Sequence, residues 1–311
     1  MTDVMTITLN PALDKTYAVD DLVPEHKLRC ANPLVEAGGG GINVSKGLKE
    51  LGNSSLAVFF AGGKNGKQLT EMLSDEAIEY KAIHVTGETR ESLVIIDHSS
   101  HKEYRIVVEG PRIDISAFNE IITLLQSTKP SWLIASGSIP EGLQEDVYAI
   151  LAKTAKGIGS KFILDTSGEA LQAALTEGIY LMKPNLKELS SLVGVESLQL
   201  KEIPTAALQL INAGKAEVIV VSMSSAGAML VTKDQQFHVP SPKVEQKSTV
   251  GAGDSMVSGM IWALQQHKSL LETLCWGVAC GSAATMNTST RLFKKSDAEK
   301  LFGWISEKGG L

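Results

Sequence analysis

Short apolar segments that alternate with helical patterns constrain the fold of this 311-residue chain most strongly. Five segments are almost continuously apolar, at residues 55–60, 132–135, 162–165, 179–182 and 218–221. Between them, apolar residues recur at helical spacing at 42–51, 68–73, 115–125, 147–155, 171–175 and 206–211. Strands that are apolar on both faces and joined by helices form parallel sheets covered on both sides. We therefore expect an α/β fold of three layers, α/β/α, around a mostly parallel central sheet.

A second set of segments predicts a small β-sheet apart from that core. Residues 16–19, 28–30 and 34–36 are short, extended and polar on one side, with Pro24 and Pro33 between them. Residues 92–96 and 104–108 flank a polar loop and predict a β-hairpin. No helical pattern lies within either group of strands. We expect one domain over residues 1–311, with the strands of a β-sheet lid inserted at about 15–37 and 88–110.

The composition narrows the class of partner and the compartment. A net charge of −6 argues against general binding of nucleic acid or a membrane surface, but it leaves room for a local cationic pocket. The three cysteines form no CxxC pair, which favours a reducing cytoplasm. No stretch approaches the roughly 18 apolar residues of a membrane span. We expect a cytoplasmic protein without nucleic-acid or membrane partners.

The segment STVGAGDSM at 248–256 places small residues and a carboxylate at the start of a helical run. It predicts a tight turn at the N-terminus of a helix, where backbone N–H groups have no hydrogen-bond acceptor. These groups attract anions, and the positive end of the helix dipole at the same place adds to the attraction. An aspartate there repels a bound phosphate, unless it accepts a proton from the group that attacks the phosphate. On the local pattern alone, Asp254 is either such a base or an ordinary acid of a first helical turn.

Four consecutive glycines at 38–41 precede Asn43 and a predicted helix. Each glycine costs backbone entropy, so the run indicates positive φ or a close approach of the backbone to a ligand. A flexible hinge is the alternative. The two interpretations are compatible, because a lid needs both a hinge and a ligand-binding site. Asn43 lies where it can cap the helix or bind a hydroxyl group.

Basic residues and a polar cluster suggest a phosphate site. Lys27, Arg90 and Arg105 fall in the lid segments, and Lys183 ends an apolar strand. Arginine suits bidentate phosphate contacts, although any one of these side chains alone is typical of a solvated surface. Asn185 and Glu188 are three residues apart, a spacing that fits either Mg²⁺ held through water or a helix capping box.

Five collinear motifs resemble those of the ribokinase-like family of sugar kinases, in its phosphofructokinase-B branch. They are TLNPALD at 8–14, GGGGINV at 38–44, SGSIP at 136–140, KPN at 183–185 with Glu188, and STVGAGDS at 248–255. Within the branch, the chain is most similar to the minor 6-phosphofructokinases of bacteria, through KLRC at 27–30, SGEAL at 167–171 and GSAAT at 281–285. The related 1-phosphofructokinases and tagatose-6-phosphate kinases carry a lysine at the position of Gly40.

The resemblance implies a ribokinase-like fold and the transfer of a phosphoryl group from ATP to the C1 hydroxyl of fructose 6-phosphate. Asp254 would be the general base, and the N–H groups of Gly251, Ala252 and Gly253 would stabilise the transferred group. The sugar phosphate would contact Asp14, Lys27, Gly39, Gly40, Asn43, Arg90, Arg105 and Ser138. The nucleotide would contact Lys183, Asn185, Ser222, Gly227 and Asn287.

The resemblance also implies two cations and a partner subunit. Glu188 would organise Mg²⁺ through water, and K⁺ would bind at Ser248, Val250, Ala284, Asn287, Ser289 and Arg291. A homodimer would form through the lid. Ser224 and Ser289 stand where relatives have glycine. We expect the first to affect the contacts with ATP and the second to affect the contacts with K⁺.

Two other functions fit the same residues. One is phosphorylation of tagatose 6-phosphate or another ketose phosphate, because a single epimeric hydroxyl is hard to read from a sequence. The other is a non-catalytic sensor of sugar phosphates or nucleotides on the same fold. The intact GAGD segment at 251–254 argues against the sensor, which would need no base at that point.

Overall fold

The computed structural model describes residues 3–288 and 291–309, with side chains through residue 307. Within these residues a nine-stranded sheet has the order β13-β12-β11-β10-β9-β8-β1-β4-β5. Seven strands are parallel: β1 (Val4–Thr8), β4 (Leu56–Ala61), β5 (Tyr80–His84), β8 (Trp132–Ser136), β9 (Lys161–Asp165), β10 (Ile179–Met182) and β11 (Ala216–Ser222). At one edge, β12 (Ala228–Val231) and β13 (Gln236–Val239) are antiparallel. The expected mostly parallel sheet is therefore confirmed.

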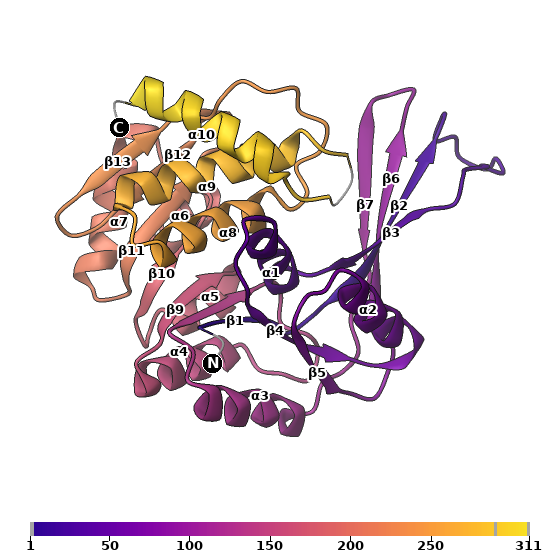
Figure 1. The fold of residues 1–311 in the computed structure, drawn as a ribbon, viewed down its shortest axis with the longest axis horizontal. Helices are drawn as coiled ribbons and strands as arrows, with labels where there is room; N and C mark the ends of the chain where they lie inside the picture. The colour runs from indigo at the N-terminus through magenta and orange to yellow at the C-terminus, as the bar shows by residue number, and fades with distance from the viewer. Residues whose placement is uncertain (1–2, 289–290, 310–311) are drawn as a thin grey trace.

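Helices cover both faces of this sheet, which confirms the expected three layers (Figure 1). One face carries α1 (Gly40–Glu50), α2 (Gly63–Asp75), α8 (Ala252–Gln265), α9 (Leu270–Thr285) and α10 (Lys295–Gly309). The other carries α3 (Ile115–Thr128), α4 (Val147–Ile158), α5 (Gly168–Ala174), α6 (Leu186–Leu192) and α7 (Ile203–Asn212). None of the helices in the described ranges combines the length and apolar character that crossing a membrane requires.

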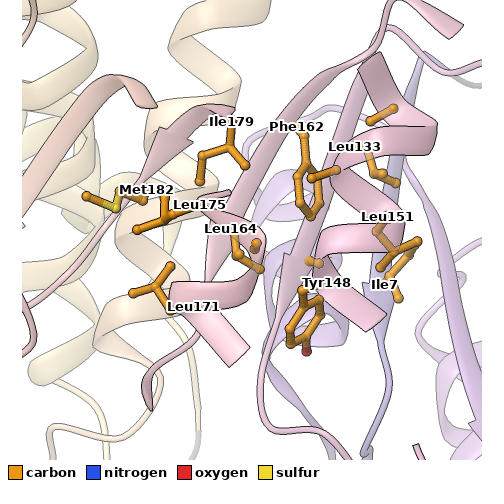
Figure 2. Close-up of a cluster of buried hydrophobic side chains, with 14 of the residues drawn as sticks. Ile7, Leu133, Tyr148, Leu151, Phe162, Leu164, Leu171, Leu175, Ile179 and Met182 are labelled. Carbon is orange, nitrogen blue, oxygen red and sulfur yellow. The ribbon is translucent and has the colours of Figure 1, made fainter. Parts of the chain in front are cut away.

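Alternate residues of each central strand fill the two cores. Figure 2 shows Ile7, Leu133 and Phe162 pointing from their strands toward Tyr148 and Leu151 of α4. The residues between them, such as Ile134 and Ile163, face α8 and α9 instead. Burial on both faces explains why these strands are almost continuously apolar in the sequence.

A separate four-stranded sheet has the order β3-β2-β6-β7 and projects from the main body (Figure 1). It consists of β2 (Ala12–Val19), β3 (Leu34–Gly38), β6 (Arg90–Asp97) and β7 (Lys102–Val107). The expected hairpin is present, because β6 and β7 pair antiparallel. The extended segment expected at 28–30 is not a strand. It lies in an exposed connection between β2 and β3, where it has no apolar face to bury.

Four further elements were not apparent in the sequence. Strands β5 and β13 form the two edges of the large sheet, where polar residues interrupt the apolar pattern, and β12, which pairs with β13, is a segment of only four residues. Helix α10 is amphipathic but rich in charged residues. Elements with little buried surface leave a weak pattern in the sequence.

The parallel strands all end at one edge of the large sheet, and polar residues follow there. Ser136 ends β8, Asp165 ends β9, Lys183 follows β10 and Ser222 ends β11. In open parallel sheets, ligands bind beyond the carboxyl ends of the strands. The first turns of α1 and α8 also lie at this edge, which therefore forms the candidate site.

Candidate active site

Asp254 is the third residue of α8, and side chains from two other elements hold its carboxylate. Asn43 on α1 donates from Nδ2 to Oδ2 at 2.9 Å, and Ser136 donates from Oγ to Oδ1 at 3.2 Å. Asp254 is therefore an acid of the first turn of α8, but no hydrogen bond among the described residues joins its carboxylate to that turn. Its carboxylate is held by other elements and does not cap its own helix.

The turn before α8 leaves backbone donors facing the site. Gly251 is in the left-handed region, with φ 72°, and α8 begins directly after it without a side-chain cap. First-turn N–H groups have no acceptor within their helix. The Ala252 N–H makes only a long contact, 3.4 Å from the Thr249 carbonyl oxygen. The predicted cluster of amides at 251–253 thus lies beside the Asp254 carboxylate.

Burial raises the pKa of Asp254 to about 6, and the negative charge of Asp165 adds to that effect. The hydrogen bonds from Asn43 and Ser136 and the positive charge of Lys183 lower it. A carboxylate with a pKa near 6 is mostly ionised at pH 7 and is a stronger base than an ordinary aspartate. The environment therefore suits acceptance of a proton at neutral pH.

Lys183 brings a buried positive charge to the same turn. Its Nζ lies 3.3 Å from Asp165 Oδ1, and its side chain is 8% exposed. Burial alone would lower the pKa of Lys183, but the charges of Asp165, Asp254 and Glu188 raise it, so the amine stays protonated. A Cβ on Gly253 would come within 3.3 Å of this Nζ. Lys183 therefore faces the anion-binding turn.

The glycine run is required by close packing. A Cβ on Gly38 would overlap the Asp14 carboxylate, and a Cβ on Gly40 would overlap Ser136 Oγ. Gly39 precedes α1 with φ 118°, a conformation that side chains rarely adopt. The run lets the first turn of α1 approach the ends of β1 and β8, which places Asn43 on Asp254. Close packing therefore accounts for these glycines.

Two of the predicted sugar-binding residues, Asp14 and Ser138, lie near the glycine run. Burial raises the pKa of Asp14 on β2 to about 6, the nearby Arg90 acting in the opposite direction. Ser138 is exposed and accepts a hydrogen bond from Asn10 Nδ2 at 3.1 Å. The amide oxygen of Asn10 is buried and has no partner among the described residues. Asn10, which sequence reasoning did not single out, therefore belongs to the polar lining.

A pocket of about 720 Å³ lies between α8, α9 and the end of β11. It is lined by Ser222 and Gly227, as predicted for a nucleotide, and by small residues including Gly253 and Gly281. Ser224 also lines it and has φ 51°, the left-handed conformation that glycine adopts most easily. This agrees with the glycine that relatives of the family carry there. Asn287, also predicted for the nucleotide, is not among the lining residues.

Asn185 and Glu188 form a capping box at the start of α6. Asn185 Oδ1 accepts from the Glu188 N–H at 2.9 Å, and Glu188 Oε2 accepts from the Asn185 N–H at 2.8 Å. The capping alternative is therefore confirmed for this pair. The box engages Glu188 Oε2 and leaves Oε1 outside it.

The three basic residues of the small sheet have different surroundings. Lys27 is exposed in the connection between β2 and β3. Figure 1 shows this connection at the end of the small sheet that points away from the main body. Arg90 donates to the backbone oxygens of Asn10 and Val108. Arg105 reaches the turn before α8, where it donates to Thr249 Oγ1 at 3.0 Å. Of the three, only Arg105 contacts the loop that leads to Asp254.

The segments predicted to hold K⁺ lie against each other. The N–H groups of Lys247 and Ser248 both point at the Thr285 carbonyl oxygen, at 2.7 and 3.4 Å. Asn287 Nδ2 donates to the carbonyl oxygens of Ala283 and Leu292, so this side chain closes the end of α9. Val250 and Ala284 belong to the same two segments, Arg291 is exposed, and Ser289 lies outside the described residues.

Besides Asn10, two functional candidates were missed in the sequence, Ser136 and Asp165. Each is the last residue of an apolar strand, and each contacts the residues around Asp254. The available signal was their position, since polar residues at the carboxyl ends of parallel strands converge on one site.

Comparison with known proteins agrees with this geometry. Residues 4–296 match the family described as "pfkB family carbohydrate kinase". ATP-dependent 6-phosphofructokinase isozyme 2 from Escherichia coli is 40% identical over 98% of this chain and 100% of its own, and its Mycobacterium tuberculosis counterpart is 36% identical over 98% and 90%. A crystal structure of the E. coli phosphofructokinase-2 in complex with potassium superposes with a TM-score of 0.94, at 40% identity over 98% of this chain and 100% of that one. The chain therefore belongs to the pfkB family of carbohydrate kinases.

Proposed function

We propose that the chain is an ATP-dependent 6-phosphofructokinase, which phosphorylates the C1 hydroxyl of fructose 6-phosphate. Two relatives with this activity match nearly the whole chain. The observation that carries the proposal is the uncapped turn before α8, where bare amides, a buried lysine and a carboxylate with a raised pKa meet. A binding protein would have no use for a base oriented by two hydrogen bonds.

In the proposed reaction, Asp254 accepts the proton of the C1 hydroxyl as its oxygen attacks the γ-phosphorus of ATP. The new O–P bond forms while the bond from the γ-phosphorus to the bridging oxygen breaks, and ADP leaves with that electron pair. Asn43 and Ser136 hold the carboxylate in position. Asp14 and the backbone at Gly39 and Gly40 orient the sugar. The products are fructose 1,6-bisphosphate and ADP.

The nucleotide would lie in the pocket between α8 and α9, with its phosphates toward the turn. The Gly251, Ala252 and Gly253 amides and the Lys183 amine would stabilise charge on the transferred group, because such donors are already oriented before reaction. Ser222 and Gly227 would flank the nucleotide, with Asn185 beside Ser222 through the backbone contact of Pro184 and Ser222. Asn287 would contribute through the loop after α9.

The residues present fit Mg²⁺ held mainly by phosphates and water. No cluster of three or more His, Cys, Asp or Glu side chains suited to a metal occurs in the described chain. Glu188 has one carboxylate oxygen outside its capping box, and Asp165 pairs with Lys183, on which the charge of Glu188 also acts. When bound, Mg²⁺ would neutralise charge on the nucleotide phosphates. Glu188 would orient its water ligands.

A K⁺ site fits the contact between the loop at 248–250 and the end of α9. The carbonyl groups around Val250 and Ala284 are hard oxygen donors in two segments that pack together. Ser248, Asn287, Ser289 and Arg291 complete the proposed set. A cation at this place would support the turn that carries the amides.

The small sheet would serve as the lid and the dimer interface, within one domain of residues 1–311. Its strand β7 and the residues after it expose Tyr104, Ile106, Val107 and Val108, at 41%, 48%, 67% and 45%. Exposed apolar patches of this kind mark interaction surfaces. Arg105 and Arg90 would bind the 6-phosphate, and Lys27, at the far end of the sheet, would reach the site of a partner subunit. An Ile106→Asp variant should then be monomeric by light scattering.

One coupled assay of ADP release tests the proposal. Fructose 6-phosphate, tagatose 6-phosphate, fructose 1-phosphate and ribose would each be supplied with Mg-ATP, with and without K⁺. The proposal expects the highest kcat/KM with fructose 6-phosphate. A preference for tagatose 6-phosphate would favour the alternative that the chain is a tagatose-6-phosphate kinase. Absence of turnover on all four substrates would contradict the kinase proposal and favour the non-catalytic sensor.

A further inference from the structure

Strand β7 of the small sheet touches the loop that leads into α8, through Glu103 and Arg105. Glu103 Oε2 accepts a hydrogen bond from Ser248 Oγ at 3.3 Å and lies 3.5 Å from Arg105 Nη2. The same Nη2 donates to Thr249 Oγ1 at 3.0 Å. Residues two apart on a strand point to the same face, which is why both side chains reach the loop.

The contact continues into the turn. Ser248 is 3% exposed, and its Oγ accepts from the Val250 N–H at 3.3 Å while it donates to Glu103. Gly251, with its left-handed backbone, follows directly and begins the amide cluster. A continuous chain of hydrogen bonds therefore runs from a strand of the small sheet to the residue before the anion-binding turn.

Glu103 differs from an ordinary surface partner of an arginine. An ion pair between two exposed side chains contributes little to stability, because water and salt screen it. Here the carboxylate is largely covered, with a side-chain exposure of 20% against 46% for Arg105, and it also binds a buried serine. Arg112 and Glu141, 2.8 Å apart and 70% and 65% exposed, show what an ordinary pair looks like in the same chain.

We propose that Glu103 is a positioning residue that links the phosphate-binding guanidinium of Arg105 to the loop carrying the anion-binding turn. This inference rests on the proposed function, in which Arg105 binds the 6-phosphate. A phosphate dianion forms stronger charge-assisted bonds with arginine than a hydroxyl does, so the substrate draws Arg105 away from Thr249. Glu103 keeps Ser248 in place, and its negative charge opposes the incoming phosphate.

Two substitutions separate the hydrogen bond from the charge. Glu103→Gln keeps a hydrogen-bond acceptor for Ser248 and removes the negative charge. The KM and the calorimetric Kd for fructose 6-phosphate should therefore both fall about threefold. The kcat should stay within about twofold of the wild type. Glu103→Ala removes the acceptor as well, so kcat should fall about tenfold through misplacement of the turn. The KM for ATP should change less than the KM for fructose 6-phosphate in Glu103→Gln.

A double-mutant cycle tests the link to the loop. Ser248→Ala and Glu103→Ala should each lower kcat, and the double variant should be no worse than the more affected single variant, because both remove one contact. Glu141→Gln, which removes a carboxylate from the exposed Arg112 pair, is the matched control. Thermal unfolding of each variant shows whether it is folded.

The link to the loop would be overturned if the losses in kcat of Ser248→Ala and Glu103→Ala were additive in the double variant. It would also be overturned if Glu103→Ala had the same kcat as the control variant Glu141→Gln. A higher KM for fructose 6-phosphate in Glu103→Gln would overturn the opposing role of the charge. Failure of the proposed function would show differently, as a wild-type enzyme that turns over none of the sugar phosphates.

Discussion

Helices α8 and α9 follow each other along the chain, and each has an acid as its third residue, but the two acids act in opposite ways. In α9, Glu272 turns back to its own helix, where its Oε2 accepts from the N–H and Oγ of Ser269 at 3.0 and 2.8 Å. In α8, Asp254 turns away, toward Asn43 on α1 and Ser136 on β8. One acid completes its helix, and the other leaves the first turn bare.

The pKa values differ in the same sense. The backbone hydrogen bond from Ser269 holds the pKa of Glu272 below its usual value. Burial raises the pKa of Asp254 to about 6. Helix α6 follows the pattern of α9, since Glu188 caps it. Asp254 does not cap its helix, and a glycine stands at the capping position before α8. Its carboxylate is thus available for chemistry.

Replacing Asp254 by Asn should give the largest effect. Loss of the base should lower kcat with fructose 6-phosphate about 10³-fold, because positioned general bases contribute about 10²–10⁴-fold. The binding of a non-hydrolysable ATP analogue, measured by calorimetry, should stay within about threefold of the wild type. A kcat near the wild-type value would show that Asp254 is not the base.

Gly40→Ala should have the next largest effect. The added Cβ would overlap Ser136 Oγ and displace it from Asp254, so kcat should fall about 10–100-fold, with a loss of about 1–3 kcal/mol in unfolding free energy. Gly157→Ala is the control, because a Cβ there meets no atom within 4 Å and the helix α4 should gain about 0.5–1 kcal/mol. Equal activity of the two variants would contradict the close packing of α1 on β8.

Ser136→Ala should move the pH dependence of activity. Asp254 must be ionised to accept a proton, so wild-type kcat/KM should fall as the pH drops below about 6. Asp14, whose pKa is also about 6, contributes to the same limb. Removal of the Ser136 donor disfavours the ionised form of Asp254, so the limb should move to higher pH and kcat should fall about tenfold. Ser55→Ala, a buried serine bonded to Ser45, should leave the limb unmoved.

Glu272→Ala should have the smallest effect on turnover and a measurable effect on stability. Loss of the capping box should lower the unfolding free energy by about 1 kcal/mol, while kcat stays within about twofold. Because the folded pKa of Glu272 is lowered, its contribution is present above the unfolded pKa and is lost as the pH falls. Urea titrations at pH 8 and pH 4 should therefore differ more for the wild type than for the variant.

The sequence predicted the parts of this site that depend on backbone geometry. The glycines at 38–41 were correctly expected at a close approach of the backbone, and Gly251 at the start of a helix, because few other residues tolerate those positions. The apolar strands predicted the sheet, whereas the edge strands β5 and β13 carry polar residues and β12 has only four residues, so none of the three stood out.

The directions of side chains could not be predicted in the same way. Asp254 and Glu188 occupy equivalent positions in their helices, and both a cap and a functional role fitted each of them locally. The outcome depends on what the rest of the fold brings near: Asn43 and Ser136 come from 211 and 118 residues away along the chain. Likewise, the place of Lys27 depends on the path of the long β2–β3 connection.

The central claim is that Asp254 serves chemistry and Glu272 serves its helix, and paired measurements on Asp254→Asn and Glu272→Ala at pH 8 test it most directly. Folding raises the pKa of Asp254 above 3.8, so its ionised carboxylate costs stability above about pH 6, and Asn removes that cost. Asp254→Asn should therefore lose turnover and keep or gain unfolding free energy, while Glu272→Ala should do the reverse. An Asp254→Asn enzyme that turns over normally but unfolds more easily would contradict the account.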